Sequence, residues 1–538
     1  MARGLGDGDG PLNDPRWLRL APVPPAAFLV AFLVVPAVMV VRYAFDPSAL
    51  AALSSPATWQ IMLLAILQAS ASTALALALG VPLANVVTRY RFRGRAVAQA
   101  LLTVPFVLPT VIVALAFRQL FDGGSGFALV LLAHAFVNLA VVVRIVGSHW
   151  RQLDPRAESV ARTLGATPWT AFRTITLPML RPALASSAAV VFTFCFTSLG
   201  IVLVLGDAST RTLEGQVLRR TSLLLDFPGA AALALLQLAI VSIVLTLGAF
   251  TRTNPGRLQA HPLLSLPAHR LPRMAVLGTA TLGAAVVLLP IMALVQSSLQ
   301  GSHGWTLDWW NGLGSIDAGT TRIGSPLEAL RTSAWYALLT GVIASIIGGC
   351  AGLAVLGARF GRAIAIIALA PLGISAATIG LGTLLAYARP PIDLRATGML
   401  VPLAHALVAV PLVVAVVAPS LRAADRRLAH VAATLGARPS RAFATAYGPI
   451  LAVVMVAAAG LAAAVSLGEF GAASFLAREG APTVPVQIVR LLARPGEQSL
   501  GSASALAVVL TIATLLLVLA VDAIGRRAQG VTGWRAHA

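Results

Sequence analysis

The sequence has 538 residues, of which 58% are hydrophobic and 11% are charged, and its mean hydropathy is +0.86. Soluble domains carry about 25% charged residues, and disordered chains have low hydrophobicity, so both classes are excluded. The net charge of +20 comes from 39 basic residues, all of them arginine, which lie in short clusters between long apolar runs. A nucleic-acid-binding domain instead gathers its positive charge on one face. We therefore interpret the chain as an integral membrane protein that binds no nucleic acid.

Twelve apolar runs are long enough to cross the hydrocarbon core of a bilayer, which takes about 20 helical residues. A helix satisfies its own backbone hydrogen bonds within lipid, so the runs predict an all-α membrane protein with twelve transmembrane helices. The predicted spans lie near 26–43, 61–86, 97–121, 127–147, 179–206, 229–250, 274–296, 333–357, 363–387, 398–418, 449–468 and 502–524. The first run also resembles a cleaved signal peptide; a retained span is favoured, because its removal would leave an odd number of spans.

The distribution of arginine predicts the orientation of the chain. If the N-terminus is placed in the cytoplasm, most arginines fall at the inner ends of the spans, as in the cluster at 89–95. Positively charged residues concentrate on the cytoplasmic side of membrane proteins. We therefore expect a multi-pass protein of the plasma (inner) membrane with both termini in the cytoplasm and with lipid around its spans.

The two halves of the chain repeat each other. The sequence AHA at 133–135 recurs at 404–406, and TLGA at 163–166 recurs at 434–437. A repeat with an even number of spans keeps its orientation, so the halves are related by an axis along the membrane normal. The predicted divisions are a cytoplasmic segment at 1–25, a six-span domain at 26–250, a linker rich in Pro and Arg at 251–273, a second six-span domain at 274–525 and a cytoplasmic tail at 526–538.

The best-matched repeated segments lie between spans on the cytoplasmic side. They are DPRAESVARTLGATPWTAFRTITLP at 154–178 and DRRLAHVAATLGARPSRAFATAYGP at 425–449. Each predicts about two turns of amphipathic helix, a break at glycine, a second helix that starts at a proline, and a closing proline that opens the next span. Such an element suits a groove on a soluble partner. An ordinary loop would not require the same spacing twice.

These segments resemble the EAA loop of binding-protein-dependent ABC importer permeases, in which E-A-A-x-x-x-G is followed by I-x-L-P. Ser159-Val160-Ala161 stands at the triplet of the first copy, with Glu158 one residue early, and His430-Val431-Ala432 stands at that of the second. The resemblance implies two tandem six-helix permease domains of type I. The residues that it places in the ATPase-coupling loops are Glu158, Ser159, Ala161, Gly165, Pro168, Pro178, His430, Ala432, Gly436, Pro439 and Pro449.

The resemblance also implies partners and a solute. Two copies of an ABC ATPase subunit would dock on the two loops, and an extracytoplasmic solute-binding protein would deliver the solute. The stretch at 198–238 looks most like that of thiamine permeases, and the stretch from Ser466 is shared with ferric iron permeases, so thiamine is expected first and ferric iron second. ATP belongs to the partner, because a phosphate-binding P-loop requires a lysine and this sequence has none. We expect no cofactor, catalytic residue or metal site in this chain.

Irregular positions within the spans predict the path of the solute. Prolines in the third and ninth runs indicate bent helices at the interface between the halves. The sequence SLG occurs at 198–200 and again at 466–468, where Glu469 follows; this carboxylate either faces a passing cation or is solvated in a loop. The candidate translocation-path residues are Pro105, Pro109, Ser198, Gly200, Pro371, Gly373, Ser466, Gly468 and Glu469.

Two other functions are weighed against an importer. A twelve-span secondary transporter driven by an ion gradient would carry ionisable coupling residues inside its spans, but the predicted spans are nearly free of acidic residues. A membrane-embedded enzyme would need an acid–base pair or a metal cluster that the sequence does not display. His134 and His405 lie at equivalent positions of the repeat, and we interpret both as packing residues that hydrogen-bond a neighbouring helix.

Overall fold

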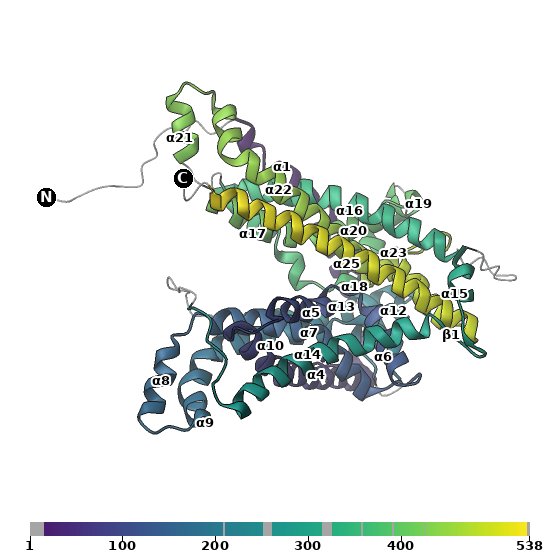
Figure 1. Ribbon diagram of the computed structural model, residues 1–538. Coiled ribbons are helices and arrows are strands. Elements are labelled where there is room, and N and C mark those ends of the chain that lie inside the picture. The colour runs from purple at the N-terminus through teal and green to yellow at the C-terminus, as the bar shows by residue number, and fades with distance from the viewer. Residues whose placement is uncertain are drawn as a thin grey trace.

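The computed structural model describes residues 16–207, 210–250, 261–314, 325–356, 359–389, 392–424 and 427–534, most of them helical (Figure 1). The first half contains η1 (Arg16–Arg19), α1 (Val23–Leu29), η2 (Val30–Val34), α2 (Val35–Ala44), α3 (Ala49–Ser54), α4 (Pro56–Arg89), α5 (Arg95–Val107), α6 (Thr110–Leu120), α7 (Phe127–Trp150), α8 (Pro155–Thr163), α9 (Pro168–Ala171), η3 (Phe172–Thr176), α10 (Leu177–Phe196), α11 (Leu199–Leu205), α12 (Leu213–Ser222) and α13 (Phe227–Phe250).

The second half contains α14 (Arg270–Ser297), α15 (Asp308–Asn311), η4 (Gly312–Gly314), α16 (Pro326–Ala354), α17 (Arg359–Ile367), η5 (Ala370–Gly373), α18 (Ala376–Tyr387), α19 (Leu394–Thr397), α20 (Leu400–Ala423), α21 (Arg427–Thr434), α22 (Pro439–Gly468), α23 (Gly471–Leu476), α24 (Val484–Leu492) and α25 (Glu497–Trp534). Two short antiparallel hairpins join β1 (Gln300–Gly301) to β2 (Gly304–Trp305) and β3 (Ala388–Arg389) to β4 (Ile392–Asp393). Parts of the predicted N-terminal segment, linker, second loop and tail, at 1–15, 251–260, 425–426 and 535–538, lie outside the described residues.

Ten helices of the described chain are long and apolar enough to cross a membrane, and two bent pairs of helices bring the number of possible spans to twelve. The bends predicted in the third and ninth runs are confirmed: α5 and α6 differ in direction by 106°, and α18 turns by 105° from the segment before it. The first bend lies at Leu108 and Pro109, because a proline has no N–H to donate and disfavours helical backbone in the residue before it. The second bend lies at Ile374 and Ser375, and Pro371 lies in η5, in the helical segment just before it.

Each half is built around three long helices, which are α4, α7 and α10 in the first half and α16, α20 and α22 in the second. Gly80 of α4 approaches α7 so closely that an added Cβ would lie 2.6 Å from the side chain of Val142. An added Cβ on Gly348 of α16 would likewise lie 2.6 Å from the side chain of Val413 of α20. Small residues let membrane helices approach closely and gain van der Waals contact. The two halves therefore pack alike at repeat-equivalent positions.

The first span of each half packs against the other half. In the first half this span comprises α1, η2 and α2; Gly382 of α18 faces Pro36 of α2, and the Tyr387 hydroxyl donates a 2.5 Å hydrogen bond to the carbonyl of Ala31 in η2. In the reverse direction, α14 lies on α4, α5 and α6, with Gly283 beside the side chain of Leu83. Each half is therefore covered on one side by a helix of the other.

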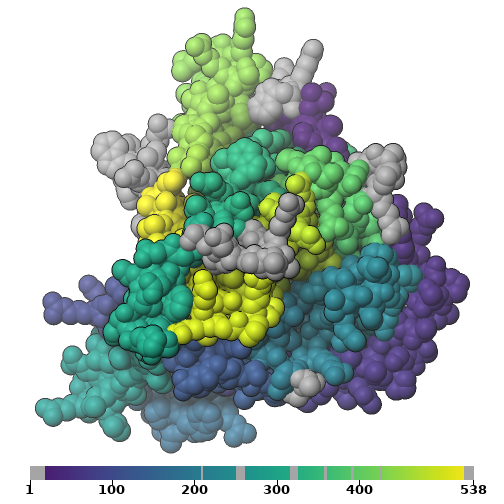
Figure 2. Space-filling model, turned by 90° about the vertical axis from the view of Figure 1, so that its right-hand side faces the viewer, coloured from purple at the N-terminus to yellow at the C-terminus, as the bar shows by residue number. Residues whose placement is uncertain are grey.

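The two repeated loops lie at one end of the molecule. Helices α8, α9 and α21 project from this end, and the described chain begins and ends near it, while the hairpin that starts with β1 lies at the opposite end (Figure 1). Figure 2 views that opposite end and shows yellow residues of α25 beside blue residues of the first half, in agreement with the contacts of α25 with α5 and α6. The halves thus meet away from the loops.

The described end of the linker is fixed to the first half. The N–H of Leu264 donates to the carbonyl of Arg89 at 2.8 Å, and the carbonyl of Leu264 accepts from the N–H of Arg91 at 2.9 Å. Tyr90 and Leu264 are paired as neighbouring parallel strands are, and the N–H of His261 donates to the carbonyl of Arg151 at 3.0 Å. The chain therefore enters α14 from a point on the first half beside α8.

Candidate functional site

The helices α8 and α21 end in the same way. Gly165 has φ of 91° and Gly436 has φ of 84°, a left-handed backbone that glycine adopts without strain. In both loops the N–H of the alanine after the glycine donates a 3.0 Å bond to a carbonyl of the triplet, at Ala161 or at Ala432. This bond from the residue beyond the glycine back to the last helical turn is the Schellman motif. The predicted glycine and alanine positions therefore form one turn, built twice.

Each loop presents two exposed apolar side chains, one helical turn apart. Val160 and Leu164 are 57% and 82% exposed, and Val431 and Leu435 are 56% and 82% exposed. Residues four apart on a helix share a face, and apolar side chains gathered on an exposed face mark interaction sites. We call these side chains the apolar pair of each loop. Trp169, on α9, is also largely exposed.

Ser159 of the first triplet and Glu158, the residue before the triplet, both bond within the chain. Glu158 forms a 3.1 Å ion pair with Arg89 of α4, and the guanidinium of Arg89 lies 5.5 Å from the centre of the Trp150 ring. The Ser159 hydroxyl donates to the carbonyl of Pro155 at 3.1 Å. The carboxylate thus holds α8 against the end of α4.

The four loop prolines differ in their positions. Pro168 and Pro439 begin helices, as predicted, at positions where a proline costs no helical hydrogen bond. Pro178 lies in the first turn of α10, as predicted, although α9 and a π-helical turn lead into it from Pro168. The expectation is wrong for Pro449, because α22 begins at Pro439 and runs through that position. A single π-helical turn, η3, precedes Pro178, and such turns absorb irregularities of a helix backbone.

Four helix breaks, two from each half, meet at one cavity of about 340 Å³. They separate α5 from α6, α10 from α11, η5 from α18, and α22 from α23. Transporters commonly build their solute sites from broken helices at the interface between repeats. The predicted path residues that line the cavity are Ser198, Gly200, Pro371, Gly373, Gly468 and Glu469.

The other predicted path residues lie around the cavity and not in its lining. Pro105 is buried within α5, and Pro109 packs against Gly468, where an added Cβ would lie 3.5 Å from its ring. The Ser466 hydroxyl lies 2.8 Å from Nδ1 of His405. These three residues therefore pack around the cavity without lining it.

Both intramembrane histidines bond a neighbouring helix, as predicted. His405 pairs with Ser466 of α22, and Nδ1 of His134 lies 2.6 Å from Nε2 of Gln68 in α4. His134 also belongs to the cavity lining, beside Asn138. Within the described parts of the chain, no three side chains of His, Cys, Asp or Glu gather as a metal site would require.

Sequence reasoning missed Glu214, which lies in the first turn of α12 and is 2% exposed. Its Oε1 atom accepts a 3.1 Å hydrogen bond from Gln237 and a second bond from the hydroxyl of Ser375, in the other half. The available signal was Thr212, whose side chain caps α12 and predicts that a helix begins there. The sequence does not reveal that this helix touches α18 and α23.

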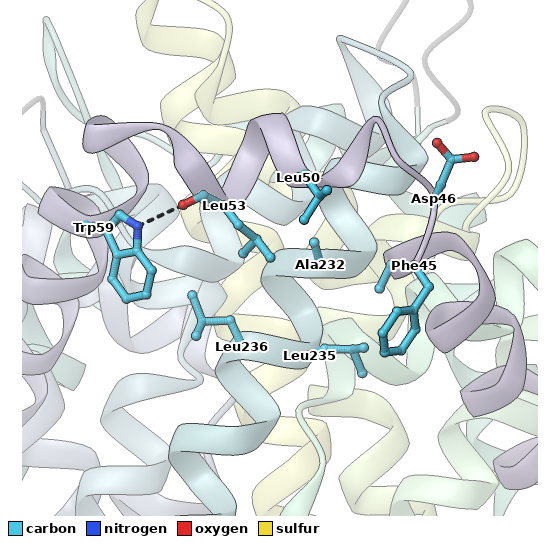
Figure 3. Close-up of a pocket in the computed structure, with 9 residues that line it drawn as sticks. Phe45, Asp46, Leu50, Leu53, Trp59, Ala232, Leu235 and Leu236 are labelled. Carbon is cyan, nitrogen blue, oxygen red and sulfur yellow. Dashed lines mark hydrogen bonds between the residues drawn. The ribbon is translucent and has the colours of Figure 1, made fainter.

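A second cavity, of about 450 Å³, lies on the first half alone (Figure 3). Its walls are largely apolar, and the indole N–H of Trp59 donates to the carbonyl of Leu53 at 2.8 Å. Asp46 lies at its edge, where hydrogen bonds from the side chain and the N–H of Ser48 hold the pKa of this carboxyl below its usual value. Trp59 lies in the first turn of α4, and a tryptophan near the end of a span suits a membrane interface. We therefore take the cavity between the halves as the candidate transport site.

Comparison with known proteins identifies the family. Residues 76–253 match the family described as the binding-protein-dependent transport system inner membrane component. The molybdenum transport system permease protein ModB of Mycobacterium tuberculosis is 32% identical over 265 residues, which cover 46% of this chain and 97% of ModB. The chain belongs to this permease family. The permease is thus an all-helical inner-membrane transport component and not an enzyme.

Further relatives are named for molybdate and tungstate and for putrescine. The molybdate/tungstate transport system permease protein WtpB of Thermococcus kodakarensis is 33% identical over 181 residues, covering 33% of this permease and 73% of WtpB. The putrescine transport system permease protein PotI of Escherichia coli is 31% identical over 236 residues, covering 40% and 84% respectively. The family match at 76–253 includes the loop with α8 and two of the four helix breaks that meet at the cavity. The part of the chain that matches the family model therefore contains the first loop and the residues that the helix breaks of the first half contribute to the cavity.

Proposed function

We propose that this chain carries both permease domains of an ATP-driven importer, at 26–250 and 274–525, joined by the linker at 251–273. The observation that carries this proposal is the turn that ends α8 and α21, which has the same glycine conformation, the same hydrogen bond and the same apolar pair in both halves. The alignment with ModB adds support, because almost all of that relative fits into less than half of this chain.

Each loop docks on one ATPase subunit, so that two copies bind the permease. ATP binds on those subunits, since this chain has no lysine with which to build a P-loop. The loops at 154–178 and 425–449 lie in the cytoplasm with both termini, and an extracytoplasmic binding protein delivers the solute at the opposite end. Dimerisation of the ATPases draws the two loops together, and the halves rock about the cavity from inward-open to outward-open.

Thiamine is the proposed solute and ferric iron is the second candidate. The support for thiamine is the resemblance of 198–238 to the thiamine type of fused permease. The relatives reported above are named for molybdenum, for molybdate and tungstate, and for putrescine, so solutes differ widely among related chains.

Reconstitution in proteoliposomes tests this function. The purified permease alone is expected to hydrolyse no ATP. With its ATPase and its loaded binding protein, it is expected to import thiamine at the expense of ATP, with no dependence on a proton gradient. Uptake by the chain alone under an imposed pH gradient would overturn the importer and favour a secondary transporter. Import of iron without thiamine would replace only the solute.

A further inference from the structure

Two carboxyl groups line the cavity between the halves. Among the described residues, the charged side chains in its lining are the carboxylates of Glu214 and Glu469. An unpaired charge in a partly desolvated cavity is costly, so each of these carboxyl groups is stabilised either by binding a proton or by a neighbouring cation. A cation that lies between the two groups stabilises both of them as carboxylates.

Both carboxylates break the internal repeat. The sequence SLG at 466–468 is followed by Glu469, whereas SLG at 198–200 is followed by Ile201. In the matching helices α12 and α24, the register that aligns VLR at 217–219 with IVR at 488–490 places Pro485 opposite Glu214. The fold therefore forms without a carboxylate at the equivalent position of the other half. A packing role shared by the two halves does not account for the charges.

The hydrogen bonds of these carboxylates need an acceptor oxygen but not a charge. Oε1 of Glu214 accepts from Gln237 and Ser375, and Oε1 of Glu469 accepts from the N–H of Ala472 at 2.9 Å, at the start of α23. The amide of glutamine has the same shape and keeps an acceptor oxygen. These bonds fix both side chains at the cavity without requiring that either carboxyl be ionised.

The rest of the lining suits an organic molecule. The rings of Phe106, Phe194 and Phe470 belong to it, and aromatic faces attract cations. Asn138 is 1% exposed and its side-chain oxygen has no hydrogen-bond partner, so a further acceptor stands at the same site. A volume of about 340 Å³ is within the range of pockets for small organic ligands.

Resting on the import function proposed above, we infer that this cavity binds an organic cation between Glu214 and Glu469 and excludes oxyanions such as molybdate. The ammonium or other cationic group lies between the carboxylates, and the apolar body of the solute lies against the aromatic rings. The permease thus selects by charge at the helix breaks, after the binding protein has released the solute.

Equilibrium binding to the full chain in lipid nanodiscs tests this inference. The probes are radiolabelled thiamine, putrescine and molybdate. We expect wild type to bind thiamine or putrescine and not molybdate. We expect E214Q and E469Q each to weaken cation binding at least tenfold, whereas E214D and E469D retain most of it. The matched control is E479Q, which removes the same charge from an exposed turn outside the cavity lining.

Each outcome decides one question. Molybdate binding to wild type, the absence of binding by both cations, or cation binding by E214Q and E469Q at the wild-type level would overturn the inference. Size-exclusion profiles identify a misfolded variant. If a glutamine variant misfolds, cation binding by the aspartate variants is compared with that of wild type and of E479Q. Co-purification of the ATPase subunit is measured on the same samples. Cation binding without ATPase co-purification by wild type would reject the import function, and the reverse result would reject only the cation site.

Discussion

Gly165 and Gly436 occupy backbone positions where a side chain is strained. A residue with a Cβ in the left-handed region costs about 1–2 kcal/mol, and each glycine lies at the tip of an exposed turn with no neighbouring atom within reach of an added Cβ. We expect Gly165→Glu or Gly436→Glu to abolish ATP-driven uptake while the protein remains folded in the membrane. The added carboxylate distorts the turn and opposes docking of the ATPase. Uptake in proteoliposomes and co-purification of the ATPase subunit measure the effect.

Gly480 provides the control for these variants. It is exposed, no atom lies within 4 Å of an added Cβ, and it is not among the positive-φ glycines of the described chain. Gly480→Glu therefore adds the same side chain without the same strain and is expected to transport normally. Wild-type uptake by both loop variants would show that the turns have no part in coupling.

The apolar pairs give α8 and α21 their exposed faces. Since an apolar docking contact is lost when one side chain becomes charged, we expect Leu164→Asp or Leu435→Asp to reduce co-purification of the ATPase at least tenfold. The double variant is expected to lose it completely. The control is Leu223→Asp, at a position that is 75% exposed and lies outside both loops. Full retention of the ATPase by the double variant would remove these faces from the interface.

The contact of α2 with α18 depends on the small size of Gly382. An added Cβ would lie 3.1 Å from both the carbonyl oxygen and the Cβ of Pro36, so a leucine forces the helices apart. Overpacking of this kind costs about 1–3 kcal/mol. We expect Gly382→Leu to lower the midpoint of thermal unfolding, measured by fluorescence-detected size-exclusion chromatography.

Gly278→Leu is the matched control for that helix contact. Gly278 is exposed in the middle of α14, and no atom lies within 4 Å of an added Cβ. Because leucine is the better helix former by almost 1 kcal/mol, this variant is expected to be at least as stable as wild type. Equal stability of Gly382→Leu and wild type would mean that α2 does not pack tightly on the other half.

Apolar length and proline positions were sufficient to predict the spans and the bends. Pro109 marks the first sharp turn because the effect of proline on its own backbone is local, whereas the second turn, at Ile374 and Ser375, only follows the helical segment that contains Pro371. Pro449 shows the limit of this rule, since a long helix tolerates a proline when its packed neighbours compensate for the lost hydrogen bond. Glu214 could not be predicted as a cavity residue, because its position depends on how α12 of one half meets α18 of the other. Proline and apolar length therefore predict the helices, whereas the residues of the cavity are brought together by contacts between segments far apart in the sequence.

For the whole molecule, the testable expectation is orientation. With both loops in the cytoplasm, a single cysteine at Thr163, in the first loop, is expected to react with a membrane-impermeant maleimide only after the cells are permeabilised. A single cysteine at Ser302, in the hairpin at the opposite end, is expected to react in intact cells. Both side chains are exposed, and the native cysteines, Cys195 and Cys350, are replaced beforehand. Labelling of Thr163→Cys in intact cells would invert the topology.

The pairing of Leu264 with Arg89 and Arg91 also bears on whether the two halves must be one polypeptide. The extended segment that carries Leu264 leads into α14, yet its backbone hydrogen bonds are made to the first half. If translation is interrupted at residue 255, the second polypeptide keeps this segment and gains a docking element that recognises the first one. Covalent continuity then serves mainly to raise the local concentration of one half around the other. Co-expressed fragments 1–255 and 256–538 are accordingly expected to assemble as a heterodimer, and replacing Leu264 by proline, which bends the segment and removes the N–H donated to Arg89, is expected to weaken their co-purification far more than it affects the intact chain.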